Sequence, residues 1–229
     1  MKLPSGQQPP TPPAQPATQT SRPAVTTEAA REPVAYVVDL ETGRREVVRE
    51  GYETRFRMDR SGFEEDGRTF VAIHNPPLRL IVVGAVHIAQ ALVPMARIAG
   101  YDPIIIDPRE TFGSEARFPG ERILNDWPDE AVEALGLDGR TALVLLTHDP
   151  KLDDPALEKA LASKCFYIGA LGSTRTHGKR ITRLEAQGFS EDQIARIHGP
   201  IGLDIGAAGQ AEIAVSVIAE MTRVLRKGA

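Results

Sequence analysis

Cysteine is almost absent from this sequence, since Cys165 is the single one among 229 residues. One thiol cannot form a disulfide within the chain or a zinc site of several cysteines, and such low usage is typical of a reducing compartment. The sequence also lacks any apolar run of about 18 residues, and its first ten residues lack the apolar segment of a secretory signal. We therefore expect a cytoplasmic protein that does not enter a membrane.

Excess positive charge is absent too. The chain has 27 Lys and Arg against 31 Asp and Glu, a net charge of −4 and a pI of about 5.8. Nucleic acids and acidic membranes require a clustered cationic surface, so neither is an expected partner. The length and the hydrophobic content of 41% allow one well-buried core with a small appendage.

Residues 1–33 form the first region and contain eight prolines among Gln, Thr and Ala. The segment offers too little apolar area to offset the conformational entropy that folding would cost. We predict a disordered Pro-rich tail. A polyproline docking motif for a partner protein is the alternative.

Residues 34–77 form the second region, where apolar and polar residues alternate. The alternating runs are VAYVVDL, RREVV and TFVAI, with turn residues at Thr42-Gly43 and Asp66-Gly67. This pattern predicts a small antiparallel β module of three or four strands with one face covered. Pro76-Pro77 ends the module, because a diproline cannot continue a strand ladder.

Residues 78–229 form the third region, in which apolar runs of strand length alternate with helical periodicity. The runs are LRLIVVG, DPIIIDP, ERILND, TALVLLT and CFYIG, and helices are expected near 86–99, 129–136, 154–163, 174–187, 190–197 and 210–227. Strands buried on both faces and repeated βα units predict an α/β fold, a Rossmann-like doubly wound parallel sheet.

Local signals predict several helix boundaries in this region. Asp154 and Pro155 suit the N-cap and first position of a helix, and Ser190 with Gln193 suits a capping box. Gly100 and Gly188 suit helix ends.

Ligands of doubly wound sheets bind outside the carboxyl ends of the strands, so the segments that follow the strands are the candidates for function. After the first strand, Gly84 and Ala89 fit the dinucleotide-binding turn, but Val86 replaces the glycine that lets a pyrophosphate approach. Its branched side chain would push a pyrophosphate outward, at a cost of roughly 1–3 kcal/mol. The helix start could still bind an anion, with His87 either as a donor or as an ordinary surface residue.

Two more strands end in polar residues. Asp107 lies where a ribose-binding acid belongs, or is a turn acid before Pro108, and Arg109 could pair with it or receive a phosphate. His148 and Asp149 could perform acid–base chemistry, line a ligand or form a plain loop.

The segment CFYIGALGSTRTHGKR carries the strongest local signal. Small residues and Ser173 precede a helix that opens at Thr174 and carries Arg175, Lys179 and Arg180 near its start, a pattern that suits a second anion site. The glycine-rich segment 199–207, around Asp204, keeps backbone bare in the same way. Cys165 is interpreted as a small buried core residue.

No catalytic residue and no metal ligand is assigned. The candidate cofactor-binding residues are Gly84, Ala85, Val86, His87, Ala89, Asp107, Arg109, Thr147, His148, Asp149, Gly169, Ala170, Leu171, Gly172, Ser173, Arg175, Lys179, Gly202, Asp204, Gly206 and Ala207.

Over residues 70–227 the chain resembles a known family. The motifs VVGAVHIAQAL, IIDPR, LLTHD, YIGALGS and GPIGLDIGAA followed by AEIA resemble the Rossmann-type domain of the xanthine dehydrogenase accessory (XdhC/CoxI-type) family. That resemblance implies binding of molybdenum cofactor, as molybdopterin or its dinucleotide form. It also implies insertion into a molybdenum hydroxylase apoenzyme such as xanthine or carbon monoxide dehydrogenase, without turnover by the chain itself. A cofactor sulfurase is a further implied partner.

The sequence departs from the family at two places. Relatives often carry a separate amino-terminal domain with a cysteine, whereas this sequence has the Pro-rich tail and the short β module. The last helix of relatives commonly opens with Thr-Pro-Glu, whereas this one has Gly209, Gln210 and Ala211. An NAD(P)-dependent oxidoreductase is the alternative function, although Val86 and the lack of a Tyr-x-x-x-Lys pair disfavour it. A scaffold that bridges partners through the Pro-rich tail is a third possibility, and a homodimer is plausible for any such chain.

Overall fold

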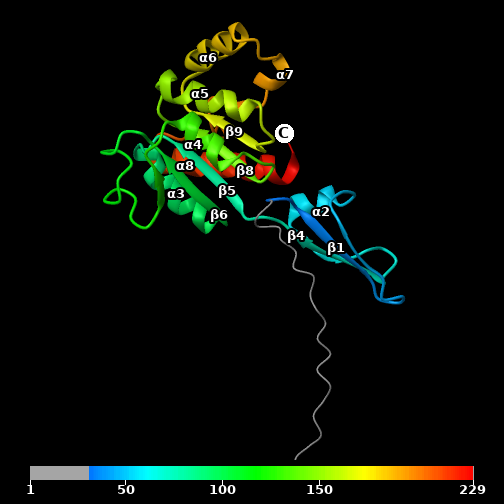
Figure 1. Cartoon of the computed structure of the whole chain (residues 1–229). Coiled ribbons are helices and arrows are strands. Elements are labelled where there is room, and N and C mark those ends of the chain that lie inside the picture. The colour runs from blue at the N-terminus through cyan, green and yellow to red at the C-terminus, as the bar shows by residue number, and fades with distance from the viewer. Residues whose placement is uncertain (1–30, 229) are drawn as a thin grey trace, which may run out of the picture.

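The computed structural model describes residues 31–228 (Figure 1). The predicted Pro-rich tail lies outside the described residues except for its last three. A four-stranded antiparallel sheet has the order β2-β1-β4-β3, with β1 (Val34–Asp39), β2 (Arg45–Val48), β3 (Gly62–Phe63) and β4 (Thr69–His74). This sheet lies beside the larger part of the molecule, as Figure 1 shows.

A six-stranded parallel sheet forms the centre of the larger part. Its order is β10-β9-β8-β5-β6-β7, with β5 (Leu78–Val83), β6 (Tyr101–Ile106), β7 (Arg122–Leu124), β8 (Thr141–Leu145), β9 (Tyr167–Ala170) and β10 (Ile197–His198). The chain builds outward from β5 to β7 and then returns to build from β8 to β10 on the other side. The predicted doubly wound sheet is confirmed. All its strands are parallel, and the order in which they are added reverses between β5 and β8.

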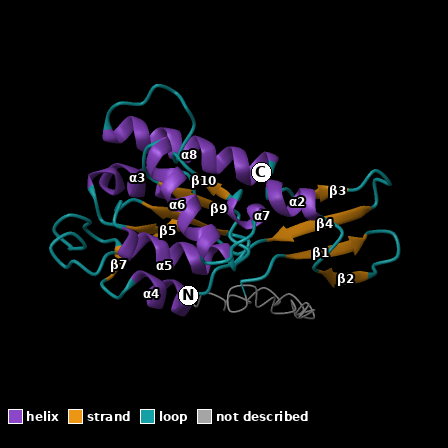
Figure 2. Ribbon diagram, turned by 90° about the horizontal axis from the view of Figure 1, so that it is seen from above, coloured by secondary structure: helices purple, strands orange, loops and turns teal. Residues whose placement is uncertain are grey.

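Helices cover both faces of this sheet (Figure 2). These helices are α3 (His87–Ile98), α4 (Pro128–Leu135), α5 (Pro150–Leu161), α6 (Thr174–Ala186), α7 (Glu191–Ile194) and α8 (Gln210–Lys227), while α2 (Glu53–Met58) belongs to the β module. Helices α3 and α8 pack on one face, and α4 to α7 supply the apolar residues that cover the other. None of the described helices is both long enough and apolar enough to span a bilayer.

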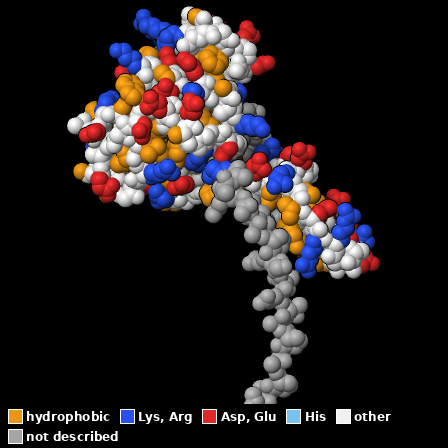
Figure 3. All heavy atoms as spheres, viewed as in Figure 1, with side chains coloured by type: hydrophobic (Ala, Val, Ile, Leu, Met, Phe, Trp, Pro, Cys, Tyr) orange, Lys and Arg blue, Asp and Glu red, His pale blue; other side chains and the backbone are white. Residues whose placement is uncertain are grey.

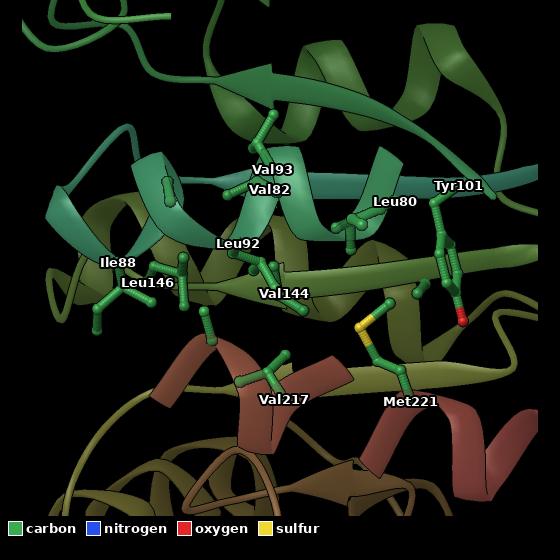
Figure 4. Packing of buried hydrophobic residues seen from close by; sticks show 14 of the residues in the cluster. Leu80, Val82, Ile88, Leu92, Val93, Tyr101, Val144, Leu146, Val217 and Met221 are labelled. Carbon is green, nitrogen blue, oxygen red and sulfur yellow. The ribbon is translucent and has the colours of Figure 1, made fainter. Parts of the chain in front are cut away.

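The core follows from the alternation of side chains along the central strands. Leu80 and Val82 of β5 point toward α3 and α8, where they meet Leu92, Val217 and Met221 (Figure 4). All five side chains are fully buried. Burying a side chain of this size stabilises a fold by about 1.5–3 kcal/mol, so these strands fix the position of everything that follows them.

The β module has its own small core. Ala35, Val37 and Val71 are buried on one face of its sheet, where Phe56 of α2 packs. The sequence did not reveal this six-residue helix. At the end of α2, Asp59 forms ion pairs with Arg140 at 2.9 Å and with Arg226 at 2.7 Å. These ion pairs join the module to the larger part.

Several predicted boundaries are confirmed. Ser190 and Gln193 form the capping box of α7, and Gly100 and Gly188 adopt positive φ angles of 87° and 91° after α3 and α6. Helix α7 ends at Ile194, however, because Ala195 and Arg196 form a turn and Ile197 begins β10.

The predicted start of α5 at Asp154 and Pro155 is wrong. The helix begins at Pro150, and Asp149 is its N-cap, accepting a hydrogen bond from the Lys151 amide at 3.0 Å. Asp149-Pro150 gives the same Asp-Pro signal five residues earlier, and Pro155 then lies inside the helix, where it removes one backbone hydrogen bond.

Candidate functional site

The loops after β5 and β8 meet at the point where the strand order reverses, which is the usual place for a ligand in such folds. Gly84 is buried there with φ +105°, and a Cβ at this position would lie 2.6 Å from Cγ2 of Thr147. Glycine is therefore required at residue 84 because two loops of the protein pack closely, in addition to any need for bare backbone.

Asp107, at the end of β6, braces the turn after β5. Its fully buried carboxylate accepts from the Ala85 amide at 2.8 Å, the Arg109 amide at 3.0 Å, and Nε and Nη2 of Arg109 at 2.8 and 2.7 Å. Burial acts to raise the pKa of Asp107, but these hydrogen bonds outweigh it and hold that pKa below its usual value. Four donors fill the carboxylate's acceptor sites, so the structure supports the interpretation of Asp107 as a turn acid paired with Arg109.

Helix α3 begins after β5, at the carboxyl edge of the sheet. Val86 is the N-cap residue, is half-buried and provides no side-chain hydrogen bond to the first-turn amides. His87 is exposed, whereas Ala89 is buried in the core. The amides of this helix start keep the partial positive charge that attracts anions.

The Thr147–Asp149 turn follows β8. Thr147 Oγ1 accepts from the Asp149 amide at 3.0 Å and donates to Asp153 at 2.7 Å, while Asp149 caps α5. His148 is exposed and has a φ of +64°, which is uncommon for a residue with a side chain. The hydroxyl of Thr147 and the carboxylate of Asp149 thus have structural partners, and the imidazole of His148 is exposed.

The candidate residues in and after β9 divide into buried strand residues and exposed residues of α6. Gly169 and Ala170 are buried within β9, and a Cβ on Gly169 would lie 2.5 Å from Cδ1 of Ile201. Ser173 caps α6 by accepting from the Thr176 amide at 3.2 Å. Arg175 and Lys179 are exposed on the first turns of α6. The strand glycine is explained by packing, and the two cations remain accessible.

A buried carboxylate that the sequence motifs did not predict holds the segment 199–207. Glu220 of α8 accepts from the Gly202 amide at 2.9 Å and from the hydroxyl of Tyr167 at 2.8 Å. Burial and the Glu220 charge raise the pKa of Tyr167, which keeps this hydroxyl a donor. A lone Glu on the apolar side of the last helix was the available signal for this contact.

The two glycine-rich segments enclose a cavity of about 480 Å³ at the carboxyl edge of the sheet. Leu171, Gly172 and Thr174 line one side, and residues 200–207 with Ile213 and Ser216 of α8 line the other. At Gly206, φ is +74° and an added Cβ would meet open space. A volume between about 300 and 1,000 Å³ is typical of small-molecule sites.

The structure therefore places most of the candidates in two groups along the carboxyl edge of the sheet. Leu171, Gly172, Gly202, Asp204, Gly206 and Ala207 line the cavity. Gly84, Ala85, Val86, Asp107, Arg109 and Thr147 to Asp149 belong to the loops after β5, β6 and β8, and His87 and Ala89 lie in the first turn of α3. Within residues 31–228, no group of three His, Cys, Asp or Glu is arranged to hold a metal. Cys165 is buried, and burial raises the pKa of its thiol to about 11.

The strand order, the reversal between β5 and β8, and the loops at the carboxyl edge define a Rossmann-type α/β domain. A protein-family model described as the XdhC Rossmann domain matches residues 80–221, and the chain belongs to this family.

Three curated proteins are similar in sequence. Uncharacterized protein YqeB of Escherichia coli K12 is 32% identical over 177 residues, which cover 73% of this chain and 32% of that protein. The molybdenum cofactor insertion chaperone PaoD of the same organism is 33% identical over 172 residues, covering 75% and 46%. A protein of Bacillus subtilis 168 described as a probable xanthine dehydrogenase subunit is 28% identical over 169 residues, covering 72% and 48%. The chain thus spans less than half the length of each.

The fold is also similar to that of a solved structure. A crystal structure described as a xanthine dehydrogenase from Bacillus halodurans superimposes with a TM-score of 0.66 and 24% identity, covering 88% of this chain and 62% of that one. At this identity the similarity concerns the fold alone.

Proposed function

We propose that the protein binds molybdenum cofactor at the carboxyl edge of its parallel sheet and assists insertion of the cofactor into a molybdenum hydroxylase apoenzyme. The observation that carries this proposal is the cavity of about 480 Å³ between residues 171–174 and 200–207, in a chain that belongs to the XdhC family. The insertion role named for PaoD, a relative at 33% identity, supports the same conclusion.

The residues at this edge suit the two chemical parts of the cofactor. The uncapped start of α3 and the exposed cations Arg175 and Lys179 provide donors and positive charge for a phosphate. The cavity beside them is lined by small and apolar residues together with Asp204, and it offers room for a ring system. The protein would hold and shield the cofactor without a turnover of its own.

On the face that Figure 3 shows, the surface of the larger part is mixed in charge. Figure 3 shows Lys and Arg side chains interspersed with Asp and Glu on the larger part of the molecule. A phosphate bound at the carboxyl edge of the sheet would therefore depend on nearby cations such as Arg175 and Lys179, which are exposed. NAD(P) binding gains no support, because the carboxylate oxygens of Asp107 already accept hydrogen bonds from Ala85 and Arg109 and are not free to bind a ribose hydroxyl.

Cofactor retention tests the proposal directly. The protein is purified from cells that make molybdenum cofactor and from cells that cannot, then denatured and oxidised, and the released pterin is measured by fluorescence. We expect pterin from the first preparation alone, and a several-fold loss in a variant carrying Arg175→Ala and Lys179→Ala. Lys164→Ala is the matched control, because Lys164 is exposed just before β9, at the opposite edge of the sheet.

Repeated preparations without pterin would contradict cofactor binding. Equal retention by the double variant and the Lys164→Ala control would contradict the assigned place. The insertion step is tested separately by adding the loaded protein to a purified molybdenum hydroxylase apoenzyme, whose activity should rise with the amount of cofactor supplied.

A further inference from the structure

Helices α5 and α6 place two Asp–Arg pairs next to each other. In the outer pair, Asp154 accepts from Nε and Nη2 of Arg183 at 2.6 and 2.9 Å, which is a closed two-point ion pair. The inner pair, Asp153 and Arg180, lies one residue and three residues earlier along the same helices. It differs from the outer pair in being almost completely buried and in remaining open.

The inner pair is buried but not joined. Asp153 and Arg180 are 1% and 2% exposed, and no ion pair forms between them within 4 Å. Asp153 Oδ1 accepts from Thr147 at 2.7 Å, and Arg180 Nη2 donates to the Leu171 carbonyl at 3.2 Å. Within residues 31–228, Asp153 Oδ2 and Arg180 Nε and Nη1 have no hydrogen-bond partner. Buried charged groups rarely remain in this condition, because unmade hydrogen bonds to charged atoms are costly.

The surroundings of the inner pair connect it to the proposed cofactor site. Thr147 follows β8, beside the point where the strand order reverses, and Leu171 lines the cavity after β9. The Thr147–Asp149 turn contacts Asp153 through the Thr147 hydroxyl, and His148 in this turn has a φ of +64°. Arg180 acts to lower the pKa of Asp153, although burial raises it more. The charges of Asp153 and Arg180 therefore interact, although the two side chains form no ion pair within 4 Å.

We propose that Asp153 and Arg180 bind a ring edge that carries an N–H donor beside a carbonyl or ring-nitrogen acceptor, once the Thr147–Asp149 turn moves aside. The carboxylate Oδ2 accepts the N–H, and the guanidinium donates to the acceptor. Such an edge occurs in the aminopyrimidinone ring of a pterin. It also occurs in cytosine and guanine, either of which would be the base of the nucleotide in a dinucleotide form of the cofactor. This choice of ligand rests on the proposed function.

Calorimetric titration of the cofactor-free full chain with pterin, CMP and GMP tests the inference. We expect at least one of the three to bind, and Asp153→Asn and Arg180→Met each to weaken its binding about ten-fold or more, as the loss of a hydrogen bond to a charged group implies. Asp154→Asn and Arg183→Met are the matched controls on the same helices and should change the affinity less than about two-fold, because that pair is closed.

A second measurement does not depend on the folding of a variant. In the wild-type protein, the side-chain Nε–H resonance of Arg180 should shift on saturation with the ligand that binds. A shift with pterin alone assigns the cofactor's own ring to the pair, and a shift with CMP or GMP assigns the base of a dinucleotide form.

An unchanged resonance with all three ligands would overturn the inference, as would equal effects of the inner and outer variants. The pair would then be a structural one bridged by water. That failure is distinguishable from failure of the proposed function, because retention of pterin from cofactor-producing cells is measured without reference to Asp153 or Arg180.

Discussion

Replacing Asp107 with Ala should destabilise the protein by about 2–3 kcal/mol. Removal of the carboxylate leaves the Ala85 amide, in a residue that is fully buried, without its acceptor, and a lost hydrogen bond to a charged group costs about 1.5–3 kcal/mol. The Arg109 side chain is 38% exposed and regains water when its partner is lost, so the ion pair itself adds little.

Urea unfolding of the full chain measures this cost as a lower midpoint at unchanged slope. Asp102→Ala is the matched control, since Asp102 is an exposed residue of the same strand, and its substitution should change stability by less than about 0.5 kcal/mol. The reasoning is refuted if Asp107→Ala is as stable as this control.

The same variant predicts a pH dependence. Because the pKa of Asp107 is lowered in the folded protein, its stabilising effect is fully present above the unfolded-state pKa of about 3.9. That effect is lost as the pH falls through the folded-state pKa. The stability difference between wild type and Asp107→Ala should therefore shrink on acidification, and a difference that stays constant would contradict the role of the carboxylate charge.

Three further perturbations have defined outcomes. Gly169→Val should lower stability by about 1–3 kcal/mol in thermal unfolding, because its side chain would collide with Ile201, whereas Gly139→Ala, whose nearest neighbour would be 3.8 Å away, should behave as wild type. The Cys165 thiol, with a pKa raised to about 11, should react with a disulfide reagent at pH 8 much more slowly in the native than in the urea-unfolded protein; equal rates would show that it is accessible. Ser173→Ala should cost about 1 kcal/mol through loss of the α6 cap and Ser173→Thr much less, and equal losses would argue against capping.

The sequence predicted the parts of the fold that depend on local patterns. Apolar runs such as those of β5 and β8 are buried on both faces in the structure, and Ser190 with Gln193 forms the expected capping box. Strand β10 was missed because two residues carry no recognisable period, and they become a strand only by pairing with β9. The start of α5 was misplaced because two Asp-Pro pairs offered the same signal.

The candidate site was predictable in place but not in detail. The loops at the carboxyl ends of the strands follow from the topology. The reason for each glycine does not, because it depends on a distant neighbour: Thr147 approaches Gly84, Ile201 approaches Gly169, and nothing approaches Gly206. Likewise, no local pattern distinguishes the open pair of Asp153 and Arg180 from the closed pair beside it, since burial and side-chain direction decide which pair closes.

A crystal structure of the protein purified with its pterin cofactor bound would test the central claim most directly. The account predicts density for the cofactor at the carboxyl edge of the sheet, with its ring in or beside the cavity formed by residues 171–174 and 200–207 and its phosphate near the start of α3 or α6. Density at the opposite edge of the sheet, or on the β module, would contradict it.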